Sequence, residues 1–421
     1  MQFGYAKILL NGITEVYPSY FGGFYIHSSV KEGLPYGWID LVDNASELLA
    51  QFENLQIGVE LKLELYKLDD EEVKIEFPPF YILYIEDNCD TASPTFAGTI
   101  KVWFGHPWFL FKDTVNRIFK ATNSAELIKK IIRSEDRGIS FEVDDENFDK
   151  TDNDGCVRYK ICETDWDFIK NKILPYVAID QLPAHFFCDD HSEFHLKSFK
   201  NMYSAEPKVL FIPHENALGE DNNVANIKEV CERNNLTMGE DHFPIHEASL
   251  KVGDLDILSE IHPHFSFENV FTEVCMSGNK VPANELASNS NTLPLDMKFM
   301  MDNKGTSTKI VRNRNIVDTL SLLFETSKSI DEMFKLSLIT PFVGHKIRVG
   351  DTAELFLALI PLDDKPKQHW LNGKWLVTRL EHFSEYEQPG KFISRVILVR
   401  PTFTIDRRST SLSMSPLLYR S

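Results

Sequence analysis

The pattern best suited to chemistry is a run of possible zinc ligands in an aromatic segment. It comprises His185, Cys188, His191 and His195, and imidazole and thiolate are ligands that zinc prefers in proteins. The same segment predicts two strands joined by a turn at residues 189–192. Neighbouring side chains of a strand point to opposite faces, so the four need not converge. Structural zinc sites usually show two tight ligand pairs, which this run lacks. We therefore expect no metal site and keep a zinc-binding module as an alternative.

Two further histidine pairs have spacings found in metal sites. His242 and His246 would share one face of a helix, but Pro244 between them disfavours a helix because it has no amide hydrogen. His262 and His264 flank a proline in an expected loop. We expect ordinary surface histidines at both places.

The carboxylates offer no catalytic arrangement that the sequence singles out. Asp165 and Asp167 stand at an expected helix start, where they favour the helix dipole, and Asp351 follows a glycine at an expected turn. The sequence contains no G-x-S-x-G, H-E-x-x-H or Walker-type loop. We expect neither a catalytic set nor a cofactor, which predicts that the chain is not an enzyme.

A helix followed by an aromatic hairpin is expected to position the histidine run. Thr164 can cap the helix, and Asp167 follows at the capping-box spacing. Apolar residues then recur on one helix face: Trp166, Ile169, Ile173 and Val177. The helix–hairpin unit has no polar constellation of its own, which favours a structural role.

The two ends of the chain are rich in short alternating strands with Gly/Pro turns, which favours barrels or sandwiches. The expected class is α+β and β-rich, with two β-barrel-like domains and an inserted α/β domain. The expected domains are 1–111 (first barrel), 112–206 (α/β), 207–238 with 310–405 (second barrel, with a helix), 239–309 (irregular insertion) and 406–421 (tail). Helices are expected at 45–52, 124–133 and 315–328.

Composition and charge exclude some partners. The 421 residues carry a net charge of −19, and binding duplex DNA through its phosphates requires a basic patch, so no specific nucleic-acid binding is expected. The six cysteines form no C-x-x-C pair, which is ordinary usage for a chain made in a reducing cytoplasm. We expect no signal peptide and no membrane-spanning run.

Four segments together resemble a known family. They are residues 102–109, residues 163–169, the expected helix at 315–328 with the strand after it, and the closing strands at 347–355, 373–382 and 392–399. In this order, which covers most of the chain, they resemble the baseplate hub proteins of contractile-tailed phages. The same segments are similar to the N-terminal hub part of type VI secretion spike proteins and to late-control hub proteins. Residues 239–309 have no counterpart in the family pattern.

The resemblance implies a homotrimer whose two barrel domains per subunit form a pseudo-sixfold ring. Such a ring adapts a hexameric tail tube to a trimeric central spike and forms part of the DNA ejection channel. The implied partners are the spike, tail tube, tape-measure and other baseplate proteins, in a virion whose parts are made in the host cytoplasm. Three chains carry 3 × −19 = −57 formal charges, which would keep DNA from sticking in the channel. The alternatives are a tail-associated cell-wall or surface-glycan hydrolase and the zinc-binding module.

Overall fold

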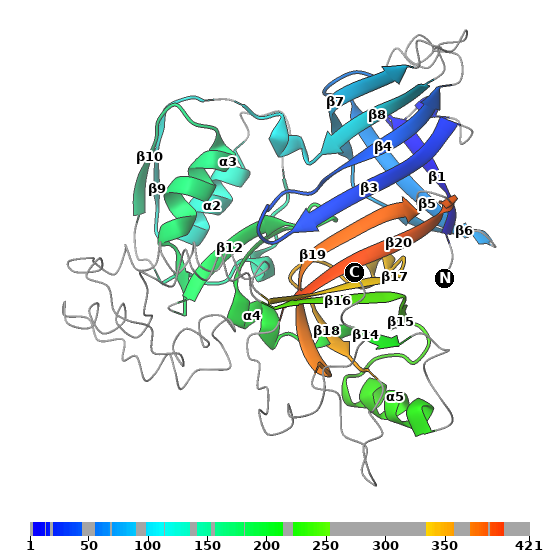
Figure 1. The fold of residues 1–421 in the computed structure, drawn as a ribbon. Helices are drawn as coiled ribbons and strands as arrows, with labels where there is room; N and C mark the ends of the chain where they lie inside the picture. Colours follow the sequence, from blue (N-terminus) through cyan, green and yellow to red (C-terminus); the bar gives the residue numbers. More distant parts are fainter. Residues whose placement is uncertain are drawn as a thin grey trace.

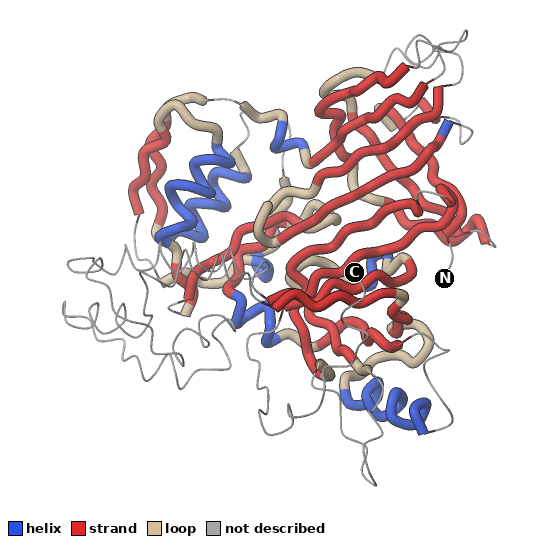
Figure 2. Tube along the Cα trace, in the orientation of Figure 1, coloured by secondary structure: helices blue, strands red, loops and turns tan. Residues whose placement is uncertain are grey.

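The structure is a computed structural model that places most of the chain. It describes residues 3–12, 14–16, 20–43, 55–67, 70–89, 98–112, 114–134, 141–152, 156–180, 182–213, 222–252, 334–357, 371–385 and 388–399. Strands dominate these residues, and the helices are short (Figure 1, Figure 2). The expected α+β, β-rich class is confirmed.

Most strands belong to one continuous sheet of 15 strands. Its N-terminal part contains β1 (Phe3–Leu10), β2 (Thr14–Val16), β3 (Phe21–Ser29), β4 (Tyr36–Asp43), β5 (Glu60–Lys67), β6 (Asp70–Glu76), β7 (Phe80–Cys89) and β8 (Gly98–Gly105). Alternation of apolar and polar residues explains these strands. In β8, for example, Ile100, Val102 and Phe104 are buried in the core and the residues between them are not.

The C-terminal part of the same sheet has its own core. It contains β14 (Pro207–Pro213), β15 (His242–Ile245), β16 (Glu247–Val252), β17 (Phe334–Pro341), β18 (Thr352–Leu355), β19 (Gly373–Glu385) and β20 (Gln388–Val399). β14 pairs in parallel with β15 and β18, and β19 pairs antiparallel with both β18 and β20. The two parts meet where β3 pairs antiparallel with β19 (Figure 1).

Neither part is a closed barrel. Among the described residues the hydrogen-bonded ladder of the large sheet does not return to its starting strand. The sheet is nevertheless curved: β1 of the N-terminal part lies against β20 of the C-terminal part, and β15 lies against β17 within the C-terminal part, in both cases without a shared ladder. The two barrel-like domains and the domain boundaries therefore stay predictions.

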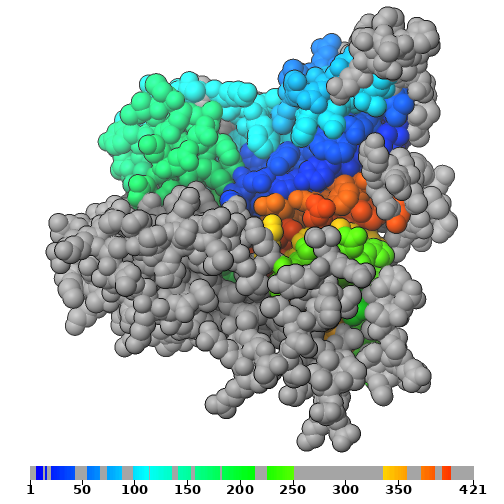
Figure 3. All heavy atoms as spheres, viewed as in Figure 1, coloured from blue at the N-terminus to red at the C-terminus, as the bar shows by residue number. Residues whose placement is uncertain are grey.

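A mixed α/β part lies beside the sheet (Figure 1, Figure 3). One half is a two-stranded ribbon, β9 (Arg117–Ala121) with β10 (Cys156–Lys160), and the helix α2 (Ser124–Ile132), which confirms the helix expected at 124–133. The other half contains α3 (Asp165–Phe168), the π-helical turn η5 (Ile169–Ile173), the 3-10 turn η6 (Leu174–Tyr176), β11 (Ala178–Ile179), β12 (Leu182–Cys188), β13 (Phe194–Ser198) and α4 (Phe199–Ser204).

The cores of the three parts interlock. Trp108, in the 3-10 turn η2 (Pro107–Phe109) after β8, packs in the α/β core with Phe168 and Phe186. Phe187 of β12, the residue after Phe186, packs instead in the core of the C-terminal strands. Neighbouring side chains of β12 thus serve two different cores, which fixes the hairpin between the α/β part and the sheet.

The expectation of an irregular insertion from residue 239 is wrong at its start. β15 pairs with β14 and β16 pairs with β17, so residues 242–252 belong to the large sheet. The helix α5 (Asn222–Arg233), which the sequence analysis missed, packs Ile227 and Cys231 against Leu210 of β14. The helices expected at 45–52 and 315–328, the rest of 239–309 and the tail at 406–421 lie outside the described residues.

Candidate functional site

The predicted hairpin forms, and it separates the four candidate zinc ligands. The His185 ring packs on the Phe199 ring, with 4.1 Å between centroids. Cys188 is fully buried, which raises the pKa of its thiol, and its Sγ lies 3.6 Å from the carbonyl oxygen of Asp189. His191 and His195 fall into different groups of possible ligands among the described residues. The four side chains therefore do not form one group of possible ligands.

The turn of the hairpin is organised by Asp189. Its Oδ1 accepts hydrogen bonds from the amides of His191 (2.9 Å) and Glu193 (3.0 Å). Its Oδ2 lies 3.0 Å from His195 Nε2 and 3.3 Å from Arg348 Nη1. Burial acts to raise the pKa of Asp189, but the hydrogen bonds and the nearby positive charges outweigh it and lower the pKa. The side chain of Asp189 therefore acts as a structural anion.

The remaining carboxylates of the sequence analysis also have structural roles. The Thr164 hydroxyl accepts from the amide of Asp167 (3.1 Å) and donates to its Oδ2 (2.7 Å), which confirms the predicted cap. Asp165 instead binds Lys160 Nζ at 2.8 Å. Asp351 Oδ2 accepts from the amide of Arg348 (3.0 Å), as expected of a turn residue.

The other histidine pairs form no site. His242 lies in β15, where its Nδ1 accepts from the amide of Gly239 (2.8 Å), and His246 follows that strand, so the predicted absence of a helix is confirmed. His262 and His264 lie outside the described residues. No described helix has both the length and the apolar character that crossing a membrane would require.

The β9–β10 ribbon has an inverted arrangement of apolar and charged side chains. Ile118, Tyr159 and Ile161 are 62 %, 61 % and 64 % exposed, whereas Lys160 is 2 % exposed and faces inward. Ile118 and Tyr159 are direct cross-strand neighbours. Five of the eight large exposed apolar side chains of the described residues lie on or beside this ribbon: Val115, Ile118, Val157, Tyr159 and Ile161. We call this surface the apolar ribbon face.

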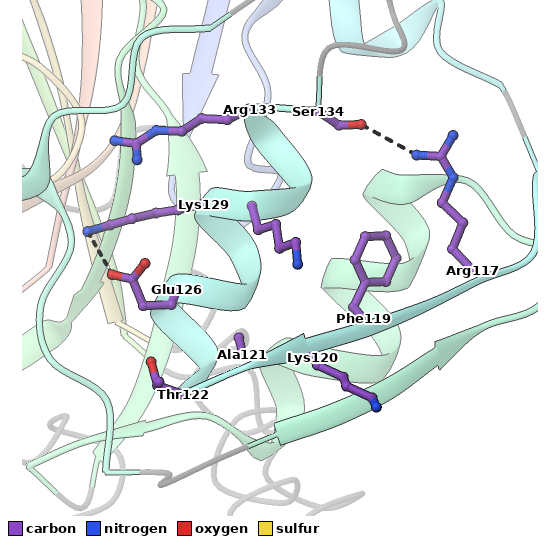
Figure 4. Close-up of a pocket in the computed structure, with 10 residues that line it drawn as sticks. Arg117, Phe119, Lys120, Ala121, Thr122, Glu126, Lys129, Arg133 and Ser134 are labelled. Carbon is purple, nitrogen blue, oxygen red and sulfur yellow. Dashed lines mark hydrogen bonds and ion pairs between the residues drawn. The ribbon is translucent and has the colours of Figure 1, made fainter.

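A basic hollow lies between the ribbon and α2 (Figure 4). Its cationic side chains outnumber its single acid, Glu126, five to one: Arg117, Lys120, Lys129, Lys130 and Arg133. Figure 4 shows Arg117 reaching Ser134 at one end and Lys129 reaching Glu126 at the other. Residues 114–134 thus carry a net charge of +4 in a chain of net charge −19.

The sequence analysis missed this surface, although residues 157–161 contain a signal. They alternate apolar and cationic residues, which predicts a half-buried strand with its apolar face inward. The structure reverses that orientation because Phe119 of β9, stacked on Phe168, occupies the interior and Asp165 neutralises the buried Lys160. Only the tertiary partners distinguish the two orientations.

Comparison with known proteins gives a match of fold. No protein-family model matches the sequence, and no curated protein matches it. The 43 kDa tail protein of prophage MuSo2 from Shewanella oneidensis superposes with a TM-score of 0.51 at 9% identity, covering 94% of this chain and 97% of that chain. A tail protein from Neisseria meningitidis MC58 gives a TM-score of 0.48 at 9% identity, covering 94% and 96%. The E. coli c3393 protein, a type VI secretion component similar to the T4 tail proteins gp27 and gp5, gives 0.47 at 9% identity, covering 94% and 78%.

An identity of 9% establishes similarity of fold and no more. The superposition on the MuSo2 protein runs over nearly the whole of both chains, so it includes both parts of the sheet and the α/β part between them. The predicted resemblance is confirmed at the level of the fold for phage tail proteins: this chain has the fold of the MuSo2 tail protein.

Proposed function

We propose that this chain is a structural baseplate hub of a phage tail. In this proposal three copies form a ring that adapts the hexameric tail tube to the trimeric central spike. The observation that carries the proposal is the fold shared with the MuSo2 tail protein over 94% of the chain. The proposed location is the virion, with the tail tube, spike, tape-measure and other baseplate proteins as partners.

The division of the large sheet supports symmetry matching. The large sheet has two apolar cores, one formed mainly by the N-terminal strands with Phe342 and Phe392 and one formed mainly by the C-terminal strands, and the two parts are joined by the β3–β19 pairing. If the two parts occupy equivalent positions in the ring, three subunits give six positions around an axis. A sixfold tube needs six equivalent contacts, whereas a threefold spike needs three.

The apolar ribbon face and the basic hollow support assembly. Contiguous exposed apolar side chains mark interaction surfaces in soluble proteins, and the cations beside them favour an acidic partner. We assign this surface to contact with a second copy of the chain, because each copy carries a net charge of −19. Arg117, Lys120 and Lys130 would face the neighbouring subunit and offset part of the repulsion among three acidic chains, whereas Lys129 and Arg133 are paired with Asp145.

The net charge also suits a channel for DNA. A trimer carries −57 formal charges, and an acidic lumen would repel phosphates during ejection. Neutralising acidic side chains of the lumen should then slow DNA passage. Ejection at an unchanged rate would count against this part of the proposal.

A structural role is favoured over hydrolysis. A glycoside hydrolase needs two carboxylates on either side of an open cleft. The carboxylates discussed above are engaged by named partners: Asp189 by Arg348, Asp165 by Lys160, and Asp351 by a backbone amide. Digestion of cell-wall material by the purified chain would favour the hydrolase instead.

Light scattering and averaged electron micrographs of the same chromatographic peak test the proposal. The expected mass is three times the 48.5 kDa subunit, and the expected image is a ring with an axial hole and a six-lobed outline. A monomer should be tested again after the candidate spike protein is added, because a hub that trimerises on its spike would form the ring only then. A chain that stays monomeric with the spike contradicts the proposal.

A further inference from the structure

A second group of ligating side chains lies on the other side of the hairpin turn. Asp190 and His191 follow the organising residue Asp189, and His345 lies in the 3-10 turn η10 (Gly344–Lys346) after β17. One ligand atom from each of Asp190, His191 and His345 lies within 4.8 Å of the other two. The group unites residues 154 positions apart in the sequence.

Asp190 is buried without a hydrogen-bond partner. Its side chain is 1% exposed, and neither carboxylate oxygen accepts a hydrogen bond from the described residues. His382 Nε2 of β19 lies 3.7 Å from Asp190 Oδ2, beyond hydrogen-bond distance. Burying a carboxylate without compensation is costly, and buried charges are normally paired or bound to metal ions. Asp189, one residue earlier, is fully compensated, because two backbone amides, His195 and Arg348 surround its carboxylate.

His345 holds a free lone pair toward this group. Its Nε2 lies 3.1 Å from the carbonyl oxygen of Glu76, which only accepts, so Nε2 carries the hydrogen and Nδ1 does not. Nδ1 is buried and has no hydrogen-bond partner. A ligating histidine commonly donates its other ring hydrogen to a carbonyl in this way.

His191 completes the group of three. Its ring centroid lies 4.1 Å from that of His345, and its Nε2 is buried without a hydrogen-bond partner. One ligand atom of each imidazole therefore lies within 4.8 Å of a carboxylate oxygen of Asp190.

We propose that Asp190, His191 and His345 bind a zinc ion, with His382 as the fourth ligand. Imidazole and carboxylate suit zinc, whereas calcium and magnesium prefer all-oxygen sites. A tetrahedral ion with bonds of about 2.0–2.1 Å sets its ligand atoms roughly 3.4 Å apart. The separations of up to 4.8 Å in the group of three require only a small contraction around the ion.

The backbone around His345 is built for this approach. Gly344 has a φ of +54°, and a Cβ at this position would lie 2.5 Å from Ile75 Cδ1. Glycine thus lets η10 pack close to β6, where the carbonyl of Glu76 fixes the orientation of His345. An ion here would join the α/β hairpin to the C-terminal strands and, through Glu76, to the N-terminal strands, so the site has a structural role.

Zinc analysis of the full chain tests the proposal. The protein, purified without chelator, is loaded with zinc, dialysed against metal-free buffer and analysed by mass spectrometry for bound zinc. About one ion per chain is expected, which is the stoichiometry of a closed structural site. A folded chain that retains no zinc overturns the proposal.

Matched variants separate this site from adventitious binding. Asp190→Asn and His345→Gln should each weaken zinc binding by roughly 100-fold or more, and His382→Gln by roughly 10-fold. The controls Glu193→Gln, in the neighbouring group around Asp189, and His242→Gln, in β15, should retain full zinc. Equal zinc content in all five variants overturns the proposal.

A spectroscopic measurement on the wild-type chain tests the site even if the variants fail to fold. Cobalt(II) replaces zinc in the wild-type chain, and a tetrahedral site gives intense visible absorption, whereas an octahedral surface site absorbs weakly. The tetrahedral spectrum, displaced by one equivalent of zinc, is the expected result. A weak octahedral spectrum would overturn the closed four-ligand site.

Discussion

The hairpin turn and the β9–β10 ribbon depart from ordinary packing in opposite directions. At the turn, Asp190 and the Nδ1 atom of His345 are buried without hydrogen-bond partners. On the ribbon, Ile118 and Tyr159 are exposed while Lys160 is buried. Proteins rarely bury an uncompensated polar group, and they rarely expose contiguous apolar surface.

The difference teaches what each region lacks. Buried oxygen and nitrogen atoms whose lone pairs have no hydrogen-bond partner can act as ligands of a metal ion. An exposed apolar face bordered by cationic side chains can instead bind an acidic protein surface. The same α/β part therefore faces inward to a metal and outward to another subunit. Departures from local packing rules in natural proteins tend to mark functional positions, and here there are two of different kinds.

The largest expected effect concerns Asp190. Zinc at 1,000 times its dissociation constant for the wild-type chain should raise the free energy of unfolding of that chain by roughly 4 kcal/mol and that of Asp190→Asn by roughly 1.4 kcal/mol or less, because the variant binds zinc about 100-fold more weakly or worse. Without metal the order should reverse, because the variant no longer buries an uncompensated carboxylate. Urea unfolding of both proteins, with and without zinc, measures the two differences. The same zinc response in both proteins would refute the assignment.

The next effect tests the inward charge of the ribbon. Asp165→Asn leaves Lys160 buried beside a neutral group and should lower the free energy of unfolding by about 3 kcal/mol. The matched double replacement, Lys160→Met with Asp165→Leu, should cost much less because both charges leave together. Chemical denaturation compares the three proteins. A single variant no less stable than the double one would show that the pair does not support the inverted strand.

Substitutions on the apolar ribbon face should change the stability of the subunit little but weaken the association of subunits clearly. Ile118→Ser with Tyr159→Ser should change the stability of one subunit by less than about 0.5 kcal/mol per site. Association should weaken about tenfold or more, as for apolar anchors of an interface. Sedimentation over a range of concentrations measures the association. Ile57→Ser is the control, since Ile57 is 65% exposed but lies away from the ribbon; equal weakening by the control would remove the ribbon from the interface.

The smallest expected effect concerns His27, a buried histidine that, unlike His345, has carboxylate partners for its ring. His27 Nε2 lies 2.8 Å from Glu32 Oε2, and His27 Nδ1 lies 3.6 Å from Glu381 Oε1. Burial acts to lower the pKa of His27, but hydrogen bonds to the two carboxylates outweigh it and raise the pKa.

Because the folded-state pKa of His27 is raised, its contribution to stability is full below the unfolded value and is lost as pH rises through the folded value. The wild-type chain should therefore exceed His27→Gln in stability more at about pH 5.5 than at about pH 8.5. Denaturation midpoints at the two pH values measure this. A difference that grows with pH would contradict the pairing.

Much of the fold was predictable from local patterns. Alternation located the strands around Ile100 and Val102, amphipathic spacing located α2, and Thr164 located the start of α3. Long-range pairing was not predictable in this way. β15 contains Pro244 and is flanked by polar residues, which predict irregular structure, and it forms because β14 offers a parallel partner.

The candidate sites show the same division. The zinc pattern drew attention to His191 because ligand types recur around it, but its true neighbours are Asp190 and the distant His345. The orientation of the ribbon depends on Asp165 beside Lys160, a contact that strand periodicity does not encode. Sequence patterns indicated which residues were chemically suitable, and tertiary contacts decided which ones meet.

Native mass spectrometry of the full chain tests the central claim most directly, because it measures subunit number and bound metal together. The account predicts an assembly of three 48.5 kDa subunits carrying three zinc ions, formed either alone or after the spike protein is added. A metal-free monomer that neither zinc nor the spike protein converts would contradict it.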